Sequence, residues 1–258
     1  MENYRRLVIA GNIGWTVLLV FLAVVSAHTR HGDGVVSQRA PLGCTYLKNV
    51  LQCYNRSADL FIPLGVTRID LENVLGGSLD VKNIHHLRWV HSKIYDLNKA
   101  IVNPQSLRTL DLSFNDITRL QDSQFQNYTN LNHLNLSNNV INDLPRDVFI
   151  NNQNIRQLCL AHNSLKAIPF QVFAPMEHLY ELNLSHNFLV TFLDHFFKFN
   201  KYIEVLLLNN NNITKITSNA LADLTELKRL DLSFNSLNIV SKGLFDSPYE
   251  PPVLKPSQ

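Results

Sequence analysis

The stretch LRTLDLSFNDI at residues 107–117 decides the fold of this chain. Its pattern restarts every 24 residues without insertion or deletion, at Leu131, Ile155, Leu179, Ile203 and Leu227. One column of the repeat is always asparagine: Asn115, Asn139, Asn163, Asn187, Asn211 and Asn235. Another is aromatic except in one copy: Phe125, Phe149, Phe173, Phe197, Leu221 and Phe245. A leucine pattern with a fixed period of about 20–29 residues is typical of a solenoid.

The centre of each copy has the alternation of a short β-strand. In residues 109–113 (TLDLS), Leu110 and Leu112 are expected to point into the coil, and Thr109, Asp111 and Ser113 to face outward. One coil cannot bury its leucines alone, so successive strands stack about 4.8 Å apart as a parallel sheet. The sequence therefore predicts an α/β solenoid shaped as a horseshoe. Its concave side is a parallel β-sheet, and its convex side is mostly irregular or short-helical.

The asparagine and aromatic columns have different roles in such a coil. The chain turns sharply after each strand, and a buried Asn amide can donate to and accept from the backbone groups that the turn leaves unpaired. We expect the six asparagines to form a ladder of this kind. The aromatic column is expected to fill the wider convex side, with a locally thinner core at Leu221.

These repeats resemble the 24-residue subclass of the leucine-rich-repeat family that is typical of extracellular proteins. The whole arrangement, with an apolar leader, two early cysteines and a short tail, is similar to short, coil-less members of the mosquito leucine-rich immune proteins. The longer members of that group carry a C-terminal cysteine region and a coiled coil, neither of which this sequence contains. The resemblance implies a secreted recognition or scaffold protein with protein partners, in the setting of innate immunity.

Residues 1–27 have the pattern of a secretory signal peptide, with two arginines, an apolar run over residues 13–25 and the cleavage tripeptide VSA at residues 25–27. The alternative is an uncleaved anchor, because residues 7–27 are about long enough to span a bilayer. The repeats are then either secreted or held at the cell surface in the type II orientation. Cleavage lowers the formal net charge from +2 to +1. A nearly neutral chain has no basic field to recruit nucleic acid.

Residues 28–43 are expected to be a flexible lead-in, and residues 44–106 an N-terminal cap with two degenerate repeats. Cys44 and Cys53 are expected to form a disulfide that staples a hairpin over the first coil, since solenoids need an end-cap and secreted chains are oxidised. Extracellular members of the family usually have four cysteines there, so this cap is reduced. The segments VTRIDL (66–71) and LRWVHS (87–92) are interpreted as the two degenerate repeats.

The regular repeats are assigned to residues 107–250 and a C-terminal tail to residues 251–258. The last predicted strand, residues 229–233, is then a potential open sheet edge. Three interpretations remain for this edge: the tail folds over it, a partner covers it, or the sequence is a shortened version of a longer product.

The predicted concave face carries balanced charge. Its charged positions are four cations and four anions: Arg108, Arg156, Lys228, Arg229, Asp111, Glu181, Glu204 and Asp231. This balance favours protein partners, with glycans as a second class, and excludes a nucleic-acid surface. Tyr180, Val205 and Leu207 are the candidate partner contacts, because they are expected to form an apolar patch on adjacent coils. The alternative is that they are scattered single residues.

Cys159 is expected to face outward between two buried leucines. Three fates remain for this thiol: a neutral residue that stays reduced, an intermolecular disulfide, or pairing within the chain. Cys159 and the C-terminal edge are thus the two places through which a homo- or heterodimer could form.

Five Asn-x-Ser/Thr sequons predict N-glycosylation, at Asn55, Asn127, Asn135, Asn183 and Asn212. Glycans at Asn135 and Asn183 would block the concave face and move binding to a flank. Two histidines in the same column, His162 and His186, are expected to be neighbours about 5 Å apart. They are interpreted as solvated surface histidines, with a pH sensor as the alternative.

No catalytic or metal site is expected. The sequence has no HExxH, GxSxG, P-loop or glycine-rich dinucleotide motif. Three histidines near the cap (His85, His86 and His91) have no carboxylate or cysteine that completes a ligand set. We therefore expect no enzyme and no cofactor. The predicted function is a secreted recognition or scaffold protein, and the alternative is an adhesion or receptor-like protein kept at the cell surface by its N-terminal anchor.

Overall fold

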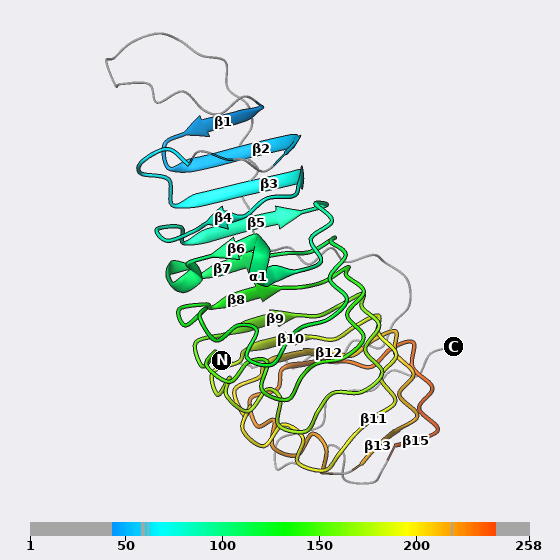
Figure 1. Ribbon diagram of the computed structural model, residues 1–258. Helices are drawn as coiled ribbons and strands as arrows, with labels where there is room; N and C mark the ends of the chain where they lie inside the picture. Colours follow the sequence, from blue (N-terminus) through cyan, green and yellow to red (C-terminus); the bar gives the residue numbers. More distant parts are fainter. Residues whose placement is uncertain (1–42, 58–59, 61, 218, 241–258) are drawn as a thin grey trace.

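The protein is a solenoid in which each coil contributes one strand to a long sheet (Figure 1). The computed structural model describes residues 43–57, 60, 62–217 and 219–240. The sheet has ten strands in the order β1-β2-β3-β5-β7-β8-β9-β10-β12-β14. Its pairings are parallel except for that of β1 with β2. The predicted parallel-sheet solenoid is therefore confirmed. The predicted signal peptide, almost all of the lead-in, Phe245 and the tail lie outside the described residues.

The ten strands are three to eight residues long. They are β1 (Cys44–Leu47), β2 (Val50–Ser57), β3 (Arg68–Leu75), β5 (His86–Val90), β7 (Thr109–Asp111), β8 (His133–Asn135), β9 (Gln157–Cys159), β10 (Glu181–Asn183), β12 (Val205–Leu207) and β14 (Arg229–Asp231). From β7 onward each strand begins 24 residues after the previous one, as the sequence period requires.

The rest of each coil is mostly irregular. A three-stranded sheet of β11 (Thr191–Phe192), β13 (Lys215–Ile216) and β15 (Ile239–Val240) forms across the later coils, and β4 (Leu79–Asp80) pairs with β6 (Ile101–Val102). The helices of the described residues are α1 (Leu97–Ala100) and the 3₁₀ turn η1 (Pro104–Ser106). None of them has the length and apolar character needed to cross a membrane.

Leucines and phenylalanines fill the interior from opposite sides. The central strand leucines, such as Leu110 and Leu134, are buried in register with one another. On the convex side Phe125, Phe149, Phe173 and Phe197 are fully buried. The first three rings stack from coil to coil, with centroids 5.7 Å apart between Phe125 and Phe149 and 6.4 Å apart between Phe149 and Phe173. Stacking coils thus produces one continuous core.

The asparagine column connects each coil to the one before it. The Nδ2 atom of Asn139 donates to the carbonyl oxygens of Leu112 (3.0 Å) and Leu136 (3.1 Å), and its Oδ1 atom accepts from the backbone N–H of Ile117 (3.0 Å). The same pattern of bonds is made by Asn115, Asn163, Asn187, Asn211 and Asn235. One amide therefore satisfies several backbone groups that the turn leaves without a partner.

The second degenerate repeat lies in a different register from the predicted one. The interpretation of residues 87–92 placed Val90 in line with Leu110, but β5 pairs Leu87 with Leu110. The repeat therefore begins three residues earlier, at Ile84, which is also buried. The assignment was wrong because residues 84–90 contain apolar side chains that fit the pattern in two registers, and only pairing with the neighbouring strands selects one.

This shift places Ser92 in the asparagine column. Its hydroxyl accepts from the N–H of Val74 (3.0 Å) and donates to the carbonyl of Val90 (2.7 Å), and its own N–H donates to Asn115 Oδ1 (2.9 Å). A serine hydroxyl can donate and accept at once, so the ladder continues one coil beyond the asparagines.

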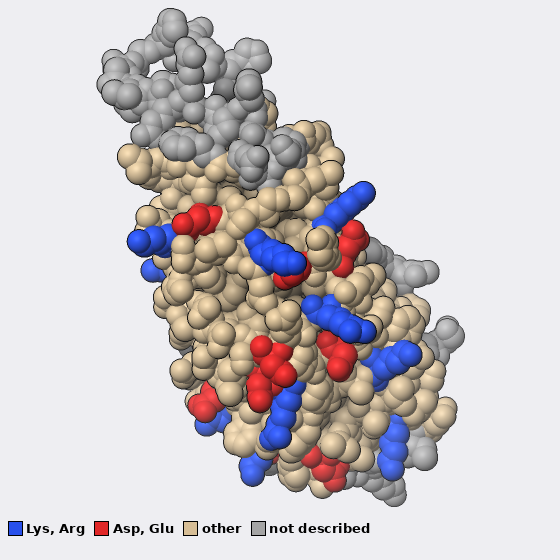
Figure 2. All heavy atoms as spheres, viewed as in Figure 1, with Lys and Arg blue, Asp and Glu red and all other residues tan. Residues whose placement is uncertain are grey.

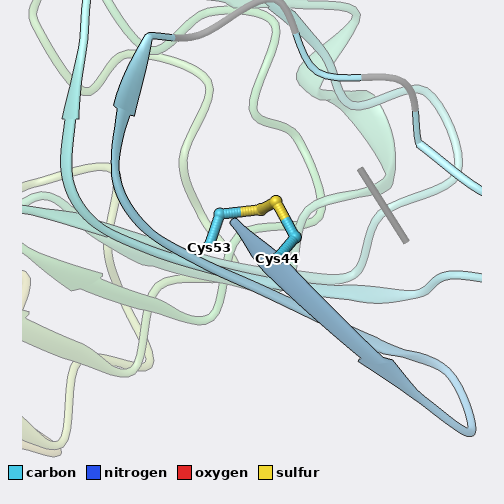
Figure 3. Close-up of a disulfide and its surroundings, with 2 residues drawn as sticks. All are labelled: Cys44 and Cys53. Atoms are coloured by element: carbon cyan, nitrogen blue, oxygen red, sulfur yellow. A yellow bond between two sulfur atoms is a disulfide. The ribbon is translucent and has the colours of Figure 1, made fainter. Parts of the chain in front are cut away.

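A disulfide closes the N-terminal end of the sheet. Cys44 on β1 and Cys53 on β2 are directly opposite in the antiparallel hairpin and are bonded to each other (Figure 3). Because β2 also pairs in parallel with β3, the hairpin is an extension of the sheet that covers the first coil. The predicted disulfide is therefore present, and Cys53 is buried in the core.

A second set of buried asparagines was missed in the sequence. Asn152 and Asn200 occupy one position on the convex side, two coils apart. Asn152 Nδ2 donates to the carbonyls of Phe125 (3.0 Å) and Tyr128 (3.2 Å), and Asn200 Nδ2 donates to those of the matching residues two coils later. These amides satisfy turns that follow the aromatic column. Their alternation with apolar residues at the same position hid the pattern.

Candidate functional site

The concave face presents three columns of outward side chains. The entry column is the residue before each strand: His85, Arg108, Asn132, Arg156, Tyr180, Glu204 and Lys228. The first column is the first strand residue: His86, Thr109, His133, Gln157, Glu181, Val205 and Arg229. The central column, two residues further on, is Arg88, Asp111, Asn135, Cys159, Asn183, Leu207 and Asp231. The backbone hydrogen bonds between neighbouring strands continue into the entry column. Asn132 N–H donates to Arg108 O (2.8 Å), and Arg156 N–H donates to Asn132 O (2.8 Å).

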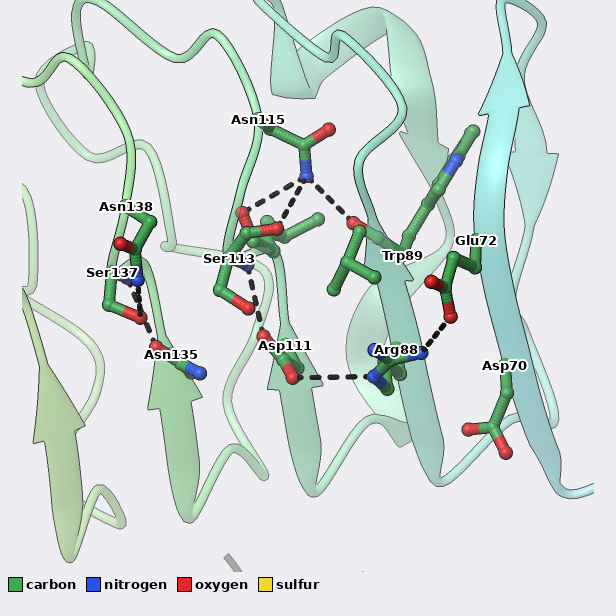
Figure 4. A network of polar contacts seen from close by, with 12 residues as sticks. Asp70, Glu72, Arg88, Trp89, Asp111, Ser113, Asn115, Asn135, Ser137 and Asn138 are labelled. Carbon is green, nitrogen blue, oxygen red and sulfur yellow. Dashed lines mark hydrogen bonds and ion pairs between the residues drawn. The ribbon is translucent and has the colours of Figure 1, made fainter. Parts of the chain in front are cut away.

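Charged side chains on the first coils of this face neutralise one another. Arg88 lies between Glu72 (3.3 Å) and Asp111 (3.9 Å), and Asp111 Oδ1 accepts from Ser113 N–H (3.0 Å; Figure 4). Asp111 and Ser113 were expected to face outward, yet Asp111 is only 8% exposed and Ser113 is buried. Neighbouring coils cover them. On the face seen in Figure 2, acidic and basic side chains are interspersed, in keeping with the small net charge.

The candidate contact residues lie on neighbouring coils. Tyr180 directly precedes β10 and is 40% exposed, whereas Val205 and Leu207 are half-buried on β12. Val205 N–H donates to Tyr180 O (3.1 Å), so the backbones of the two coils are adjacent at this point. Their role as partner contacts remains a prediction.

The Cys159 thiol is half-buried in the central column, on the outer face of β9. Burial raises the pKa of Cys159 to about 11, and Glu181 and Asp111 act in the same direction, although bonds to Ala161 and Ser137 oppose it. The thiol is the nucleophile only when ionised. At neutral pH this environment favours a reduced, unreactive side chain over an intermolecular disulfide.

We expect iodoacetamide to alkylate Cys159 about 100-fold more slowly at pH 8 in the folded protein than in denatured protein, because burial raises the pKa of the thiol to about 11. The rate should rise about tenfold per pH unit up to that pKa. Non-reducing conditions keep Cys44 and Cys53 in their disulfide, so the reaction reports on one thiol. Equal rates in the folded and denatured protein at pH 8 would contradict the burial of this side chain.

The five sequons differ in exposure. Asn55, Asn127 and Asn212 are exposed, Asn135 is half-buried, and Asn183 is buried, with its Oδ1 atom accepting from the N–H and hydroxyl of Ser185. A glycan on Asn183 requires its Nδ2 atom to leave the folded surface, so the structure argues against modification of this residue.

Glycopeptide mapping of secreted protein should find Asn55, Asn127 and Asn212 occupied and Asn183 bare. The expected cause is exposure of the amide, since the Asn135 and Asn183 sequons have the same tripeptide sequence. High occupancy at Asn183 would mean that the concave face is blocked by a glycan, as the sequence alone suggested.

His162 and His186 lie on successive turns just after the strands. Their rings stack with centroids 3.9 Å apart, closer than the predicted 5 Å. Both have left-handed backbone conformations with φ of 54°, as do Phe114, Asn138, Asn210 and Phe234 at φ of 54–57° in the same column. Burial lowers the pKa of both imidazoles, and His186 lowers that of His162 further. The two imidazoles are therefore mostly neutral at physiological pH. Their rings stack on each other at the exposed edge of the sheet.

Two histidines in the first column were not recognised as site candidates in the sequence. His86 Nδ1 contacts Thr109 Oγ1 (2.8 Å), and His133 Nδ1 is buried with no hydrogen-bond partner among the described residues. Burial lowers the pKa of His86 and of His133, and nearby arginines lower both further. The column of His86 could be recognised only once the register of β5 was known. The column of His133 was predictable from the 24-residue period, but the sequence count of charged positions left histidines out.

Comparisons with known proteins agree with this architecture. The model of the family described as leucine rich repeat matches residues 105–165, 177–237 and 201–247. A search of curated proteins gives no match. Among solved structures 409 chains match, so the fold is widely shared and does not specify a function.

Two of these structures resemble this chain in fold although their sequence identity to it is low. The crystal structure of human 5T4 (Wnt-activated inhibitory factor 1, trophoblast glycoprotein) has a TM-score of 0.63 at 21% identity, over 78% of this chain and 83% of that one. The crystal structure of a TLR13–ssRNA13 complex has a TM-score of 0.61 at 23% identity, over 69% of this chain and 26% of that one. This chain thus spans about a quarter of the TLR13 chain. At these identities the likeness shows the fold alone.

Proposed function

The chain belongs to the leucine-rich-repeat family, and from this premise we propose that it is a secreted recognition protein that binds protein partners on its concave face. One observation carries the proposal. The inward columns repeat the same residue type in each coil, whereas the entry, first and central columns change chemistry from coil to coil. An array of different side chains on a rigid parallel sheet is a surface suited to selective recognition.

An extracellular location is part of the proposal. The signal-like residues 1–27, the sequons and the Cys44–Cys53 disulfide all support it, because disulfides persist in oxidising compartments. The resemblance to insect immune proteins extends the proposal to innate immunity. A cell-surface adhesion or receptor-like protein held by an uncleaved anchor is the second candidate, supported by the length of the apolar segment. Glycans are the second class of partner.

The location is tested by expressing the full chain in secreting insect cells. The first candidate predicts soluble protein in the medium that begins at His28, as measured by mass spectrometry of the N-terminal peptide. Protein that stays in the membrane fraction with residues 1–27 attached would instead support the cell-surface candidate.

The binding face is tested with two matched double variants. Secreted wild-type protein is immobilised and used to capture extracellular partners, which are identified by mass spectrometry. We expect Tyr180→Glu/Val205→Glu to reduce capture of a given partner at least tenfold. The control is Phe170→Glu/Phe199→Glu, since both phenylalanines are 41% exposed and lie in the returning segments of the coils. A loss confined to the control would move binding away from the concave face.

A further inference from the structure

On four successive coils the entry and first columns of the concave face contain basic side chains and no acidic ones. On β5, β7, β8 and β9 the entry and first columns contain a group that we call the basic strip: His85, His86, Arg108, Asn132, His133 and Arg156. Arg108 and Arg156 are exposed, and the others are half-buried. The remaining members of these columns on the four coils, Thr109 and Gln157, are neutral. The charge of the whole concave face is balanced, but these four coils carry a local excess of positive charge.

The two arginines of the basic strip form no ion pair with a described residue, unlike most of the other concave cations. Arg229 on β14 is also without an ion pair among these residues, but its Nε atom is buried. Arg68 is paired with Asp70 (3.1 Å), Arg88 with Glu72 (3.3 Å) and Lys228 with Glu204 (2.6 Å). Within the described part of the chain, Arg108 and Arg156 have no carboxylate within 4.0 Å. Between them, His133 carries a buried Nδ1 atom without a hydrogen-bond partner in the same residues. The two exposed guanidinium groups therefore supply positive charge and hydrogen-bond donors for an anion.

The pKa values of His86 and His133 also reflect the positive charge around them. Burial is the main cause of the lowered pKa of His86, and Arg68, His85, Arg108 and His133 add to it from the surrounding strands. For His133 the cause after burial is Arg156. All the charged or titratable groups that act on these two imidazoles are basic, so a bound anion would supply the missing opposite charge.

We propose that the basic strip docks an acidic segment of a protein partner, with carboxylates on Arg108 and Arg156. This inference rests on the proposed function and specifies the chemistry of the partner. Guanidinium groups match carboxylates in a bidentate fork. The two arginines are two strands apart, which is about 9.6 Å at the usual strand spacing. Side chains three residues apart in a polyproline II segment project on one side at about 9.3 Å, so an acidic residue at every third position fits this spacing.

A long polyanion fits the surface less well than a short acidic segment. Beyond Arg156 the same two columns continue with Tyr180 and Glu181, and then with Glu204. A uniformly charged nucleic acid or sulfated glycan that followed the columns would meet these carboxylates. A protein segment with two acidic residues at one end avoids them, and protein is therefore the occupant that the charges favour.

The test uses fluorescein-labelled peptides containing Glu-Pro-Pro-Glu or, as the neutral probe, Gln-Pro-Pro-Gln. Fluorescence anisotropy with the full secreted chain should show saturable binding of the acidic peptide and at least tenfold weaker binding of the neutral one. Arg108→Gln/Arg156→Gln should reduce binding at least tenfold. The matched control is Arg119→Gln/Arg146→Gln, which removes two exposed arginines from outside the concave columns and should leave binding unchanged. Equal melting temperatures show that both variants fold.

The pH dependence gives a second readout. An anion stabilises the protonated imidazoles and raises the lowered pKa values of His86 and His133, so binding takes up protons. Affinity should therefore rise as pH falls from 7.5 to 5.5, where glutamate stays ionised. The rise should shrink in His86→Gln/His133→Gln. An affinity that is constant over this range would overturn the part played by the histidines.

The outcomes separate this inference from the proposed function. No binding of the acidic peptide up to millimolar concentration, or equal binding by the arginine double variant, overturns the docking inference. Capture of a protein partner that depends on Tyr180 and Val205 but not on Arg108 and Arg156 would leave the proposed function intact. A single-stranded oligonucleotide that binds more tightly than the acidic peptide, and is lost in the same variant, would reassign the strip to nucleic acid.

Discussion

Replacing Phe149 by alanine is expected to lower the free energy of unfolding by about 3–5 kcal/mol. The side chain is fully buried on the convex side, and its ring stacks between those of Phe125 and Phe173. Alanine leaves a cavity that the fixed coil spacing prevents from closing, because the rings on both sides are anchored by their own coils. Urea unfolding followed by circular dichroism measures the change.

The control for this change is Phe188→Ala, which removes the same ring from a side chain that is 49% exposed. We expect it to cost less than about 1 kcal/mol. Similar losses at both positions would mean that the convex aromatic column does not hold the coils together.

Replacing Asn187 by leucine is expected to cost about 2–4 kcal/mol. Its Nδ2 atom donates to Leu160 O (2.9 Å) and Leu184 O (3.1 Å), and its Oδ1 atom accepts from Leu165 N–H (3.0 Å). Leucine has a similar size but leaves these buried backbone groups without a partner, and each unsatisfied group costs about 1–3 kcal/mol. Some of this cost is offset by the apolar side chain.

Asn142→Leu is the matched substitution on the surface, since Asn142 is exposed. It should change stability by no more than about 0.5 kcal/mol. If Asn187→Leu melted with the same midpoint as wild type, the asparagine column would have to be a by-product of the repeat and not a structural element.

The regular coils were predictable because their signal is local and repeated. A period of 24 residues fixes which leucines are buried, and identical coils can stack only in register. The degenerate repeats had no such support. At residues 84–90 apolar side chains fit two registers, and the pairing of Leu87 with Ile69 and Leu110 decides between them. Ser92 could therefore not be recognised as a ladder residue before the register was known.

Parts of the candidate site depended on the same tertiary information. The charge count of the concave face covered only the six regular repeats, so it omitted Arg88, and it treated each charged residue as independent. Pairing in space neutralises Arg68, Arg88 and Lys228. It leaves Arg108, Arg156 and Arg229 without an ion pair among the described residues. Likewise, alternation predicted that Cys159 faces outward, but the adjacent coils bury enough of the thiol to raise its pKa to about 11.

The sequence by itself determined the solenoid, the parallel sheet, the columns of leucine and asparagine, and the partners in the disulfide. These follow from spacing along the chain, because each coil repeats the same short-range rule. Only the tertiary structure decided the register of the degenerate coils, the shielding of Asp111 and Cys159, and the local excess of positive charge. Those properties are set by side chains on neighbouring coils, about 20 residues apart in sequence and about 5 Å apart in space, and no rule within one repeat specifies which residues meet there.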